Sequence, residues 1–561
     1  MSEPGSQAED SGQRKSWQDY ALLTAVASAV SLASFIYFFR RGEILLYGDA
    51  VAHINIARRV FDSRTPGWQQ LGTVWLPLPH LLVMPFIVSN WVWRTGVGGS
   101  LASMVAYVFG GVGVARLFWG GSIAEPRWPI SLHALRLGGW LAALFYLLNP
   151  NLIYLQSTAM TEPLSMALGT WAVVFYAEFQ TSSEIAANAA SEPERAAALQ
   201  RAIRSLRNCG VALAAGMLTR YDNWFLAVAI SGLLLWQTIR SRRQLGPAEK
   251  VAINRALRRF VTLVVLTALL WLGYNYGTYG NALEFATGPY SARAIAQRSA
   301  ASGVVHPGYH DLGTAALYFF KCAKLNIYEG PLVAAALLTA IFGTLALLYR
   351  RRKAVALLLW LPLTFYALSI AYGGVPIFMP RSWPFSYYNV RYGLQLLPMF
   401  SVTAGLTATM LWGNSRARRA TVALLILIFA AMYGEALKEA PITLREARVN
   451  SVTRLALEKK LADAFKALPP EATLLMYTGD HAGALQQAGF SLKRVVTENN
   501  YHLWQSALQD PAQSAQYVVA MNGDPVWQAV ERDGKQLQVM SAFYVPGQPA
   551  ATIYRSSASR R

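Results

Sequence analysis

Long apolar runs separated by short charged segments constrain this chain more than any other feature. The first run, residues 21–39, lies between a polar N-terminus and the pair Arg40-Arg41. A helix of about 20 residues crosses the hydrocarbon core of a bilayer. Charged residues make up only 14% of the 561 residues and hydrophobic residues 54%, whereas soluble domains are about 25% charged. The sequence therefore excludes a purely soluble enzyme and a disordered protein, and it predicts an α-helical polytopic membrane protein.

The apolar runs predict about eleven transmembrane helices, with ends uncertain by several residues. We place them at residues 21–39, 97–119, 135–155, 163–180, 209–222, 224–239, 259–276, 330–349, 354–372, 391–412 and 420–437. The first helix follows a short tail, residues 1–20, and has no small-residue cleavage site, which favours an uncleaved signal anchor. The only cysteines, Cys209 and Cys322, lie beside or inside apolar runs, so neither a disulfide framework nor a cysteine-based metal cluster is expected.

Basic residues gather in three loops, at 240–259, 350–353 and 416–419. Lys and Arg collect on the cytoplasmic side of membrane proteins, so these loops and the N-terminus are expected there. All three face one side only if residues 76–93 do not cross the membrane. That stretch holds three prolines and a histidine, which favours a re-entrant or interfacial helix. An ordinary span at this place, the alternative, would reverse part of the orientation. Because the net charge of +20 is explained by these loops, no nucleic-acid partner is expected.

The predicted outer side carries the long connecting segments, residues 41–96, 156–162, 277–329, 373–390 and everything after Lys438. Long ordered loops on one face of a membrane protein commonly carry function. Residues 445–561 contain no span and alternate short apolar runs with helical patterns. We therefore predict a transmembrane domain over residues 21–440, followed by a small extracytoplasmic α/β domain.

The first outer loop contains an amphipathic stretch with one acid at its start. In residues 50–62 apolar residues recur at helical spacing, which predicts a helix lying at the outer interface. Asp49 is placed at the N-cap of this helix, and His53 lies one turn further on the same face. The simple alternative is that Asp49 only caps the helix and His53 is only an interfacial polar residue.

A second acid, Glu162, lies between two predicted spans in the sequence Thr161-Glu162-Pro163. It is a candidate helix-start residue stabilised by the helix dipole. In the predicted topology it also lies on the same outer side as Asp49. Two carboxylates that face one cavity are what glycosyl transfer needs, because one of them takes the proton of the acceptor hydroxyl.

Two arginines lie at the ends of apolar segments. Arg220 and Asp222 fall in a break between two short apolar helices, and Arg391 lies at the outer end of a span. An arginine in the membrane is costly unless it faces a cavity or a partner, and its planar fork fits a pair of phosphate oxygens. The alternatives are snorkelling of Arg391 to the interface and a salt bridge between Arg220 and Asp222.

Four short motifs together resemble a known family. They are GDAVAHINIARR from residue 48, TEPL from residue 161, LTRYDNW from residue 218 and RYGLQLLP from residue 391. In their order and spacing they are similar to the integral-membrane glycosyltransferases of the GT-C superfamily. Within it, the motifs resemble bacterial relatives of the protein O-mannosyltransferases and lipid A aminoarabinose transferases. The resemblance covers roughly residues 20–440.

The resemblance implies transfer of a sugar from a polyprenyl-phosphate-linked donor to a glycan, lipid or protein acceptor, and we expect a single displacement with inversion. The absence of a cleavable signal and the cysteine-poor outer segments are compatible with a bacterial inner membrane. It implies Asp49 as the catalytic base and Glu162 as the acid that orients the acceptor or assists the base. Arg391, and with less support Arg220, match the groups that hold the leaving lipid phosphate. The helices at 50–62 and 76–93 look like the two juxtamembrane helices of the family.

Further residues around these motifs are candidate substrate contacts. His53 is placed to bond Asp49 or a sugar hydroxyl, and Asp222 and Asn389 stand beside the two arginines. Tyr388 ends an aromatic cluster suited to stacking on sugars, although such residues also form interfacial belts.

One departure from the family concerns metal dependence. Ala50 follows Asp49 where many relatives carry a second acid, which weakens the case for a divalent metal. A divalent metal stays possible, but no paired-acid motif supports it. Two other classes stay open, a transporter or flippase of lipid-linked sugars and a non-catalytic scaffold with a ligand-binding outer domain.

Overall fold

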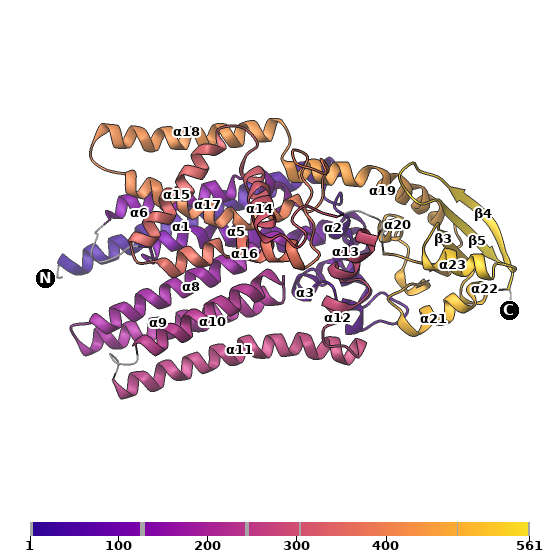
Figure 1. The fold of residues 1–561 in the computed structure, drawn as a ribbon, viewed down its shortest axis with the longest axis horizontal. Coiled ribbons are helices and arrows are strands. Elements are labelled where there is room, and N and C mark those ends of the chain that lie inside the picture. The colour runs from indigo at the N-terminus through magenta and orange to yellow at the C-terminus, as the bar shows by residue number, and fades with distance from the viewer. Residues whose placement is uncertain (1–3, 124–129, 242–245, 302–304, 480, 559–561) are drawn as a thin grey trace.

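The computed structural model describes residues 4–123, 130–241, 246–301, 305–479 and 481–558. Long helices run side by side along the molecule, and a small sheet with its helices stands at one end (Figure 1). The helices up to the end of the bundle are α1 (Pro4–Arg40), α2 (Gly48–Arg59), α3 (Leu78–Val83), α4 (Asn90–Thr95), α5 (Val97–Trp119), α6 (Leu132–Leu147), α7 (Pro150–Gln156), α8 (Glu162–Asn188), α9 (Glu192–Met217), α10 (Asp222–Ser241), α11 (Pro247–Tyr279), α12 (Glu284–Thr287), α13 (Ala292–Ala301), α14 (Leu312–Ile327), α15 (Val333–Tyr349), α16 (Lys353–Tyr372), α17 (Leu397–Leu411) and α18 (Arg416–Lys438). Three 3-10 helices join them, η1 (Trp68–Leu71), η2 (Phe86–Val88) and η3 (Val390–Leu396).

Six helical segments of the described chain are long and apolar enough to cross a membrane. They are Trp17–Arg40, Val97–Trp119, Glu249–Tyr279, Lys353–Tyr372, Val390–Leu411 and Arg416–Lys466, the last of which joins α18 to the helix that follows it. The apolar helices α6 and α15 are shorter, and α8, α9 and α10 lie alongside with more charged residues. The chain is thus an integral membrane protein, while the number of eleven spans stays a prediction.

One predicted span, residues 135–155, is broken into α6 and α7. Asn149 caps α7 by accepting hydrogen bonds from the backbone N–H groups of Asn151 and Leu152, at 3.0 and 3.2 Å. Pro150 is the first residue of α7, where its missing N–H costs nothing, but it cannot continue α6. The break turns the chain beneath the outer loops.

The predicted span 209–222 also differs from the structure. Its residues 209–217 are the second half of α9, which begins at Glu192 and forms a long hairpin with α8, and α10 begins at Asp222. Residues 186–198 are divided between the end of α8 and the start of α9.

The basic clusters lie at one end of the bundle. Arg352, before α16, forms an ion pair with Glu184 near the end of α8 at 3.0 Å. The starts of α11 and α18 lie at this end too, away from α2, α12, α13 and the C-terminal sheet (Figure 1). Residues 242–245 of the first cluster lie outside the described residues. This arrangement agrees with one cytoplasmic end and one outer end, an orientation that we keep as a proposal.

The segment 76–93 folds into three short pieces rather than one helix. Pro77 and Pro85 precede α3 and η2, and Ser89 precedes α4. Helices α2 and α3 lie at the end of the bundle opposite the N-terminus (Figure 1), and α2 packs against α3, η1 and η2.

The C-terminal region contains a five-stranded sheet with the strand order β2-β1-β3-β5-β4. Strands β1, β2 and β3 are parallel, whereas β5 is antiparallel to β3 and β4. The elements of this region are α19 (Ile442–Lys466), β1 (Leu474–Met476), α20 (Ala482–Ala488), η4 (Leu492–Arg494), β2 (Val495–Val496), α21 (Tyr501–Gln509), α22 (Pro511–Ser514), β3 (Tyr517–Met521), α23 (Pro525–Arg532), β4 (Leu537–Phe543) and β5 (Ala551–Ser556). The small α/β fold has the predicted character. Its first helix, however, reaches into the transmembrane part.

Candidate active site

Asp49 is the carboxylate of the site that solvent reaches most easily. We predicted Asp49 at the N-cap of α2, but it lies in the first turn of that helix. The N-cap residue is Tyr47, whose side chain makes no capping hydrogen bond. The Asp49 carboxylate accepts a hydrogen bond from Arg391 Nη2 instead. Its side chain is 39% exposed, against 0% for Glu162. An ion pair with a distant arginine has therefore replaced the local cap that the sequence pattern favoured.

Glu162, the first residue of α8, is enclosed behind Asp49. Its Oε1 accepts hydrogen bonds from Arg391 Nε at 3.1 Å and from Arg220 Nη1 at 3.2 Å. Its Oε2 is buried and has no hydrogen-bond partner among the described residues. Glu162 thus joins the two arginines and keeps one oxygen free to accept a further hydrogen bond.

Arg391 is held by the backbone of η3. The Val390 carbonyl accepts hydrogen bonds from Asn326 Nδ2 at 2.7 Å and from Cys322 Sγ at 3.1 Å, which fixes η3 against α14. A side chain on Gly393 would collide with the Cys322 backbone and the Asn326 amide, so only glycine allows this close approach. The Arg391 guanidinium is therefore held in a fixed position before any substrate arrives.

Glu446 belongs to the site although the sequence analysis missed it. It lies in α19, with Oε1 3.7 Å from Arg391 Nη1. Its carboxylate accepts hydrogen bonds from the backbone N–H groups of Val390 and Arg391, at 3.1 and 3.3 Å, and from Tyr47 OH at 2.8 Å. Its complete burial distinguishes Glu446 from an ordinary surface acid. The predicted boundary at residue 445 instead places it in the outer domain. The charged neighbours Arg445 and Arg448 make the sequence around it look like that of an ordinary exposed helix.

Arg220 and Asp222 do form the salt bridge considered as an alternative, with Nε and Oδ2 3.5 Å apart. They do not stand alone, because Tyr366 OH bonds both residues, at 3.0 Å to Arg220 Nη2 and 3.2 Å to Asp222 Oδ2. Asp222 Oδ1 accepts a hydrogen bond from Ser165 Oγ at 3.1 Å. Through Glu162, this cluster is continuous with that of Arg391.

Aromatic rings cover the two guanidinium groups. The Tyr392 ring centroid lies 4.9 Å from Arg220 Cζ and 5.0 Å from Arg391 Cζ, and Tyr47 covers Arg391 at 5.0 Å. Such contacts stabilise a desolvated cation. Four carboxylates meet two guanidinium groups here, so the formal charge of the ionised network is −2.

His53 lies beside this network and not on Asp49. Its Nδ1 is 2.9 Å from Nε2 of His80 in α3, and its ring centroid is 4.9 Å from that of Trp75. Burial lowers the pKa of His53 to about 4, although Asp49 and Glu162 act in the opposite direction. Burial also holds the pKa of His80 well below its usual range. The pair is therefore neutral near pH 7.

Acid is expected to destabilise the protein through His53. Between pH 6.5 and about 4 the unfolded chain binds the proton and the folded protein does not, so stability is lost as the pH falls. The free energy of unfolding should decrease by about 2 kcal/mol from this residue at pH 5. We expect the unfolding midpoint of His53→Gln to fall less between pH 7.5 and pH 5 than that of the wild type. The exposed His133→Gln should behave as the wild type does, and equal falls in all three proteins would contradict the assignment.

Tyr388 and Asn389 stand outside the charged network. The backbone of Tyr388 pairs with that of Phe378 in an isolated bridge, and its side chain is 43% exposed. Asn389 adopts a φ of 55° and donates a hydrogen bond from Nδ2 to the Pro376 carbonyl at 3.0 Å. Asparagine tolerates this left-handed conformation better than most residues, so Asn389 shapes the turn that leads into Arg391.

An arginine side chain lies among the carboxylates of the site. No three His, Cys, Asp or Glu side chains of the described residues converge in a way that would hold an ion. The guanidinium of Arg391 lies between Asp49, Glu162 and Glu446, where a bridging cation would have to lie. In the described residues a guanidinium thus takes the place between these carboxylates.

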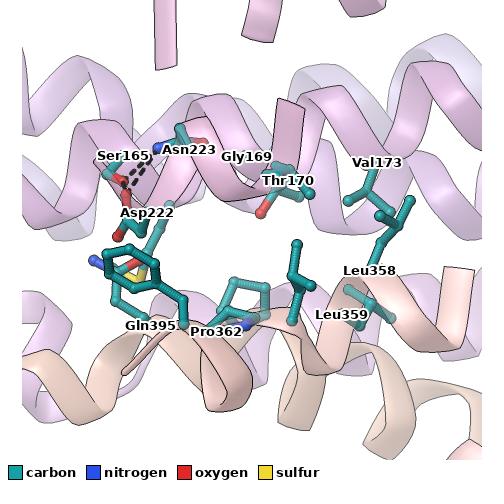
Figure 2. A pocket seen from close by; sticks show the side chains of 15 residues that line it. Ser165, Gly169, Thr170, Val173, Asp222, Asn223, Leu358, Leu359, Pro362 and Gln395 are labelled. Atoms are coloured by element: carbon teal, nitrogen blue, oxygen red, sulfur yellow. Dashed lines mark hydrogen bonds between the residues drawn. The ribbon is translucent and has the colours of Figure 1, made fainter. Parts of the chain in front are cut away.

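A pocket extends from Asp222 between α8, α10 and α16 and encloses about 530 Å³, part of it open to the surroundings. Figure 2 shows Asp222, Ser165 and Asn223 together at one end, and Val173, Leu358 and Leu359 at the other. Two buried polar atoms on its wall, Thr170 Oγ1 and Gln395 Nε2, have no partner among the described residues. The lining is thus largely apolar, with its charged group, Asp222, at one end.

Neither a protein-family model nor a curated protein sequence matches the chain. Solved structures do match. ArnT from Cupriavidus metallidurans aligns over 96% of this chain and 98% of its own, with a TM-score of 0.52, at 13% identity for the form bound to undecaprenyl phosphate and 14% for the apo form. An oligosaccharyltransferase from Archaeoglobus fulgidus aligns over 96% of this chain and 74% of its own at 11% identity and a TM-score of 0.49. The resemblance found in the motifs is thus confirmed at the level of fold, since the chain shares the fold of ArnT from Cupriavidus metallidurans.

Proposed function

We propose that this protein is an inverting glycosyltransferase that moves a sugar from a polyprenyl-phosphate-linked donor to an acceptor at the outer face of the membrane. The observation that carries the proposal is the junction of Asp49, Glu162 and Arg391. Three distant segments bring one accessible carboxylate onto a rigid ion-pair network. A purely structural ion pair would not need its carboxylate open to solvent.

In the proposed reaction the Asp49 carboxylate takes the proton of an acceptor hydroxyl. The acceptor oxygen attacks the anomeric carbon as the bond from that carbon to the phosphate oxygen breaks, and the configuration inverts. The lipid phosphate leaves as an anion and needs no strong general acid. Glu162 Oε2, the free buried oxygen, is placed to accept a hydrogen bond from a substrate hydroxyl.

The pocket beside Asp222 is the proposed slot for the prenyl chain of the donor. Its apolar walls suit isoprene units. Arg220 does not line the pocket itself, but it pairs with Asp222 at the polar end, and it is the cation that we propose for the lipid phosphate. Arg391 and Arg220 then stabilise the leaving phosphate electrostatically while they hold the carboxylates in place.

Filling the pocket should weaken donor binding without changing the chemical step. Val173→Phe adds a ring to the apolar end, and we expect KM for the donor to rise about tenfold while kcat changes little, since lost uniform binding acts on KM. Val105→Phe places the same ring on an exposed position of α5 and should leave both constants unchanged. Equal KM values for the two variants would remove the pocket from donor binding.

The reaction itself is tested with purified protein in detergent. Undecaprenyl phosphate linked to different hexoses and pentoses serves as donor, and envelope lipids, glycans and peptides serve as acceptors. The proposal expects release of undecaprenyl phosphate and a product of inverted anomeric configuration. A flippase would show neither, because detergent abolishes transport. The absence of turnover with every donor would contradict the proposal.

A further inference from the structure

Arg59, the last residue of α2, is a partly buried cation that forms no ion pair with any acid of the described residues. Its Nε donates a hydrogen bond to the Gln70 carbonyl at 2.6 Å, and its two Nη atoms donate to no group of the described residues. The neighbouring Arg58 donates four hydrogen bonds, one of them to Asp62. Of these two arginines of one helix, Arg59 thus has donors left for a ligand.

The position of Arg59 is costly for a cation. Burial lowers the pKa of its guanidinium, an effect that Glu498 and Tyr279 oppose. Glu498 is engaged elsewhere, because its carboxylate accepts hydrogen bonds from the backbone N–H and the hydroxyl of Thr478, at 2.9 and 2.7 Å. A charge taken from water without a counter-ion costs free energy, and groups held in this way gather at functional sites.

The chain is shaped around this guanidinium. Gly72 adopts a φ of 76°, and a side chain there would place its Cβ 3.1 Å from Arg59 Nη2, so glycine keeps the space beside the fork open. Gln70, whose carbonyl holds Nε, donates a hydrogen bond from its own Nε2 to the Asn499 carbonyl of the C-terminal region at 3.0 Å. The guanidinium is therefore held between the first outer loop and the C-terminal region.

Exposed indole rings accompany α2 from Arg59 toward the start of the helix. The helix η1 packs against α2. The segment after it runs back along α2, because Gln70 contacts Arg59 whereas the ring centroid of Trp75 lies 4.9 Å from that of His53. Trp68 is 63% exposed and Trp75 is 36% exposed. Open aromatic rings of this kind suit the apolar faces of sugars.

The two ends of α2 set the reach of a ligand. Asp49, the proposed base, lies in the first turn and Arg59 in the last, about 15 Å apart along the helix axis. The phosphate that leaves the donor lies at the reacting carbon, beside the acceptor hydroxyl, and cannot reach so far. An acidic group of the acceptor, a few sugar units from the hydroxyl that reacts, can reach Arg59.

We propose that Arg59 binds an oxyanion, a carboxylate or a phosphate, which the acceptor carries away from its reacting hydroxyl. The inference rests on the proposed transfer reaction and names the class of acceptor, an acidic glycan that extends along α2. The two Nη atoms of Arg59 donate to two oxygens of the anion. Trp68 and Trp75 pack against the sugar units that lie between the anion and Asp49.

The test measures binding rather than turnover, by isothermal titration calorimetry on the full-length protein in detergent. The probes are trigalacturonic acid and maltotriose with one terminal phosphate, and plain maltotriose is the neutral reference. We expect at least one acidic probe to bind the wild type at least tenfold more tightly than maltotriose does, and the tighter of the two tells a carboxylate from a phosphate. Arg59→Gln should abolish this preference without changing maltotriose binding, whereas Trp68→Ala should weaken acidic and neutral probes by the same factor.

Two further variants separate binding from a structural role. Arg59→Lys keeps the charge without the planar fork and should lose most of the preference. Arg555→Gln removes the same charge from an exposed position of β5 and should bind like the wild type. The unfolding midpoint of Arg59→Gln should equal that of the wild type or exceed it, because a cation without a counter-ion is removed. A structural arginine would lower it.

Equal binding of acidic and neutral probes by the wild type would overturn the inference, and so would a preference that survives in Arg59→Gln. Inorganic phosphate that binds as tightly as the phosphorylated probe would also overturn it, because Arg59 would then hold a free anion. Acidic probes that bind at Arg59 in a protein without turnover would contradict the proposed function alone. Turnover without any preference for acidic probes would contradict this inference alone.

Discussion

Asp49→Asn is expected to lower kcat by about 10²–10⁴-fold, because the amide cannot take the proton of the acceptor hydroxyl. The substitution keeps the size of the side chain and its ability to accept a hydrogen bond from Arg391, so the fold should persist. The rate is measured as release of undecaprenyl phosphate at saturating donor, and the fold as the unfolding midpoint. The drop should appear in kcat and in kcat/KM alike, as for a group that acts in the transition state.

The matched control for this variant is Asp62→Asn. Asp62 also accepts a hydrogen bond from an arginine, Arg58 Nε, at 2.8 Å, but it does not touch the network of Arg391. Its loss should lower the unfolding midpoint while kcat per folded molecule is kept. If Asp49→Asn retained wild-type turnover, another group would have to be the base.

Arg391→Gln is expected to destabilise the protein by about 3–5 kcal/mol, because it removes the counter-charge of buried carboxylates. Glu446 loses its cation and Glu162 keeps only Arg220. Unfolding in denaturant, followed by circular dichroism, measures the effect. Adding Glu446→Gln to the variant should restore part of the loss, since the uncompensated carboxylate is then gone.

Arg116→Gln serves as the comparison for Arg391→Gln. Arg116 pairs with Glu178 at 2.7 Å, but 40% of its side chain is exposed, and such pairs contribute about 1 kcal/mol or less. Similar losses for the two variants would show that burial of the Arg391 network has no special energetic role. A double variant no more stable than Arg391→Gln would contradict the specific pairing with Glu446.

The sequence predicted the class of fold and most of the residues that meet at the site. Asp49, Glu162, Arg220, Asp222 and Arg391 belong to short motifs whose polar residues stand at the ends of apolar runs, and this local contrast was visible. Which of them touch was not visible, because such contacts depend on how helices far apart in the sequence pack. The predicted N-cap role of Asp49 was wrong for this reason, because its carboxylate pairs with the distant Arg391 and does not cap α2.

Hydropathy alone could not predict two other features. Asn149-Pro150 is a helix start inside an apolar run, so a window of hydropathy merges α6 with α7. Glu446 lies in a charged helix of ordinary appearance, and nothing local distinguishes it from the exposed Asp463 of the same helix. Only the packing of that helix against η3 buries it.

The unbroken course of α19 has a consequence for engineering. The same rod carries Glu446 at one end and contacts the helix α20 of the C-terminal sheet further along. A single inserted residue would turn everything beyond it by about 100°. The C-terminal α/β region therefore cannot be replaced without regard to the orientation of α19. A replacement domain would have to continue α19 with the same helical phase. Otherwise the Glu446 carboxylate would lose its hydrogen bond from Tyr47 OH.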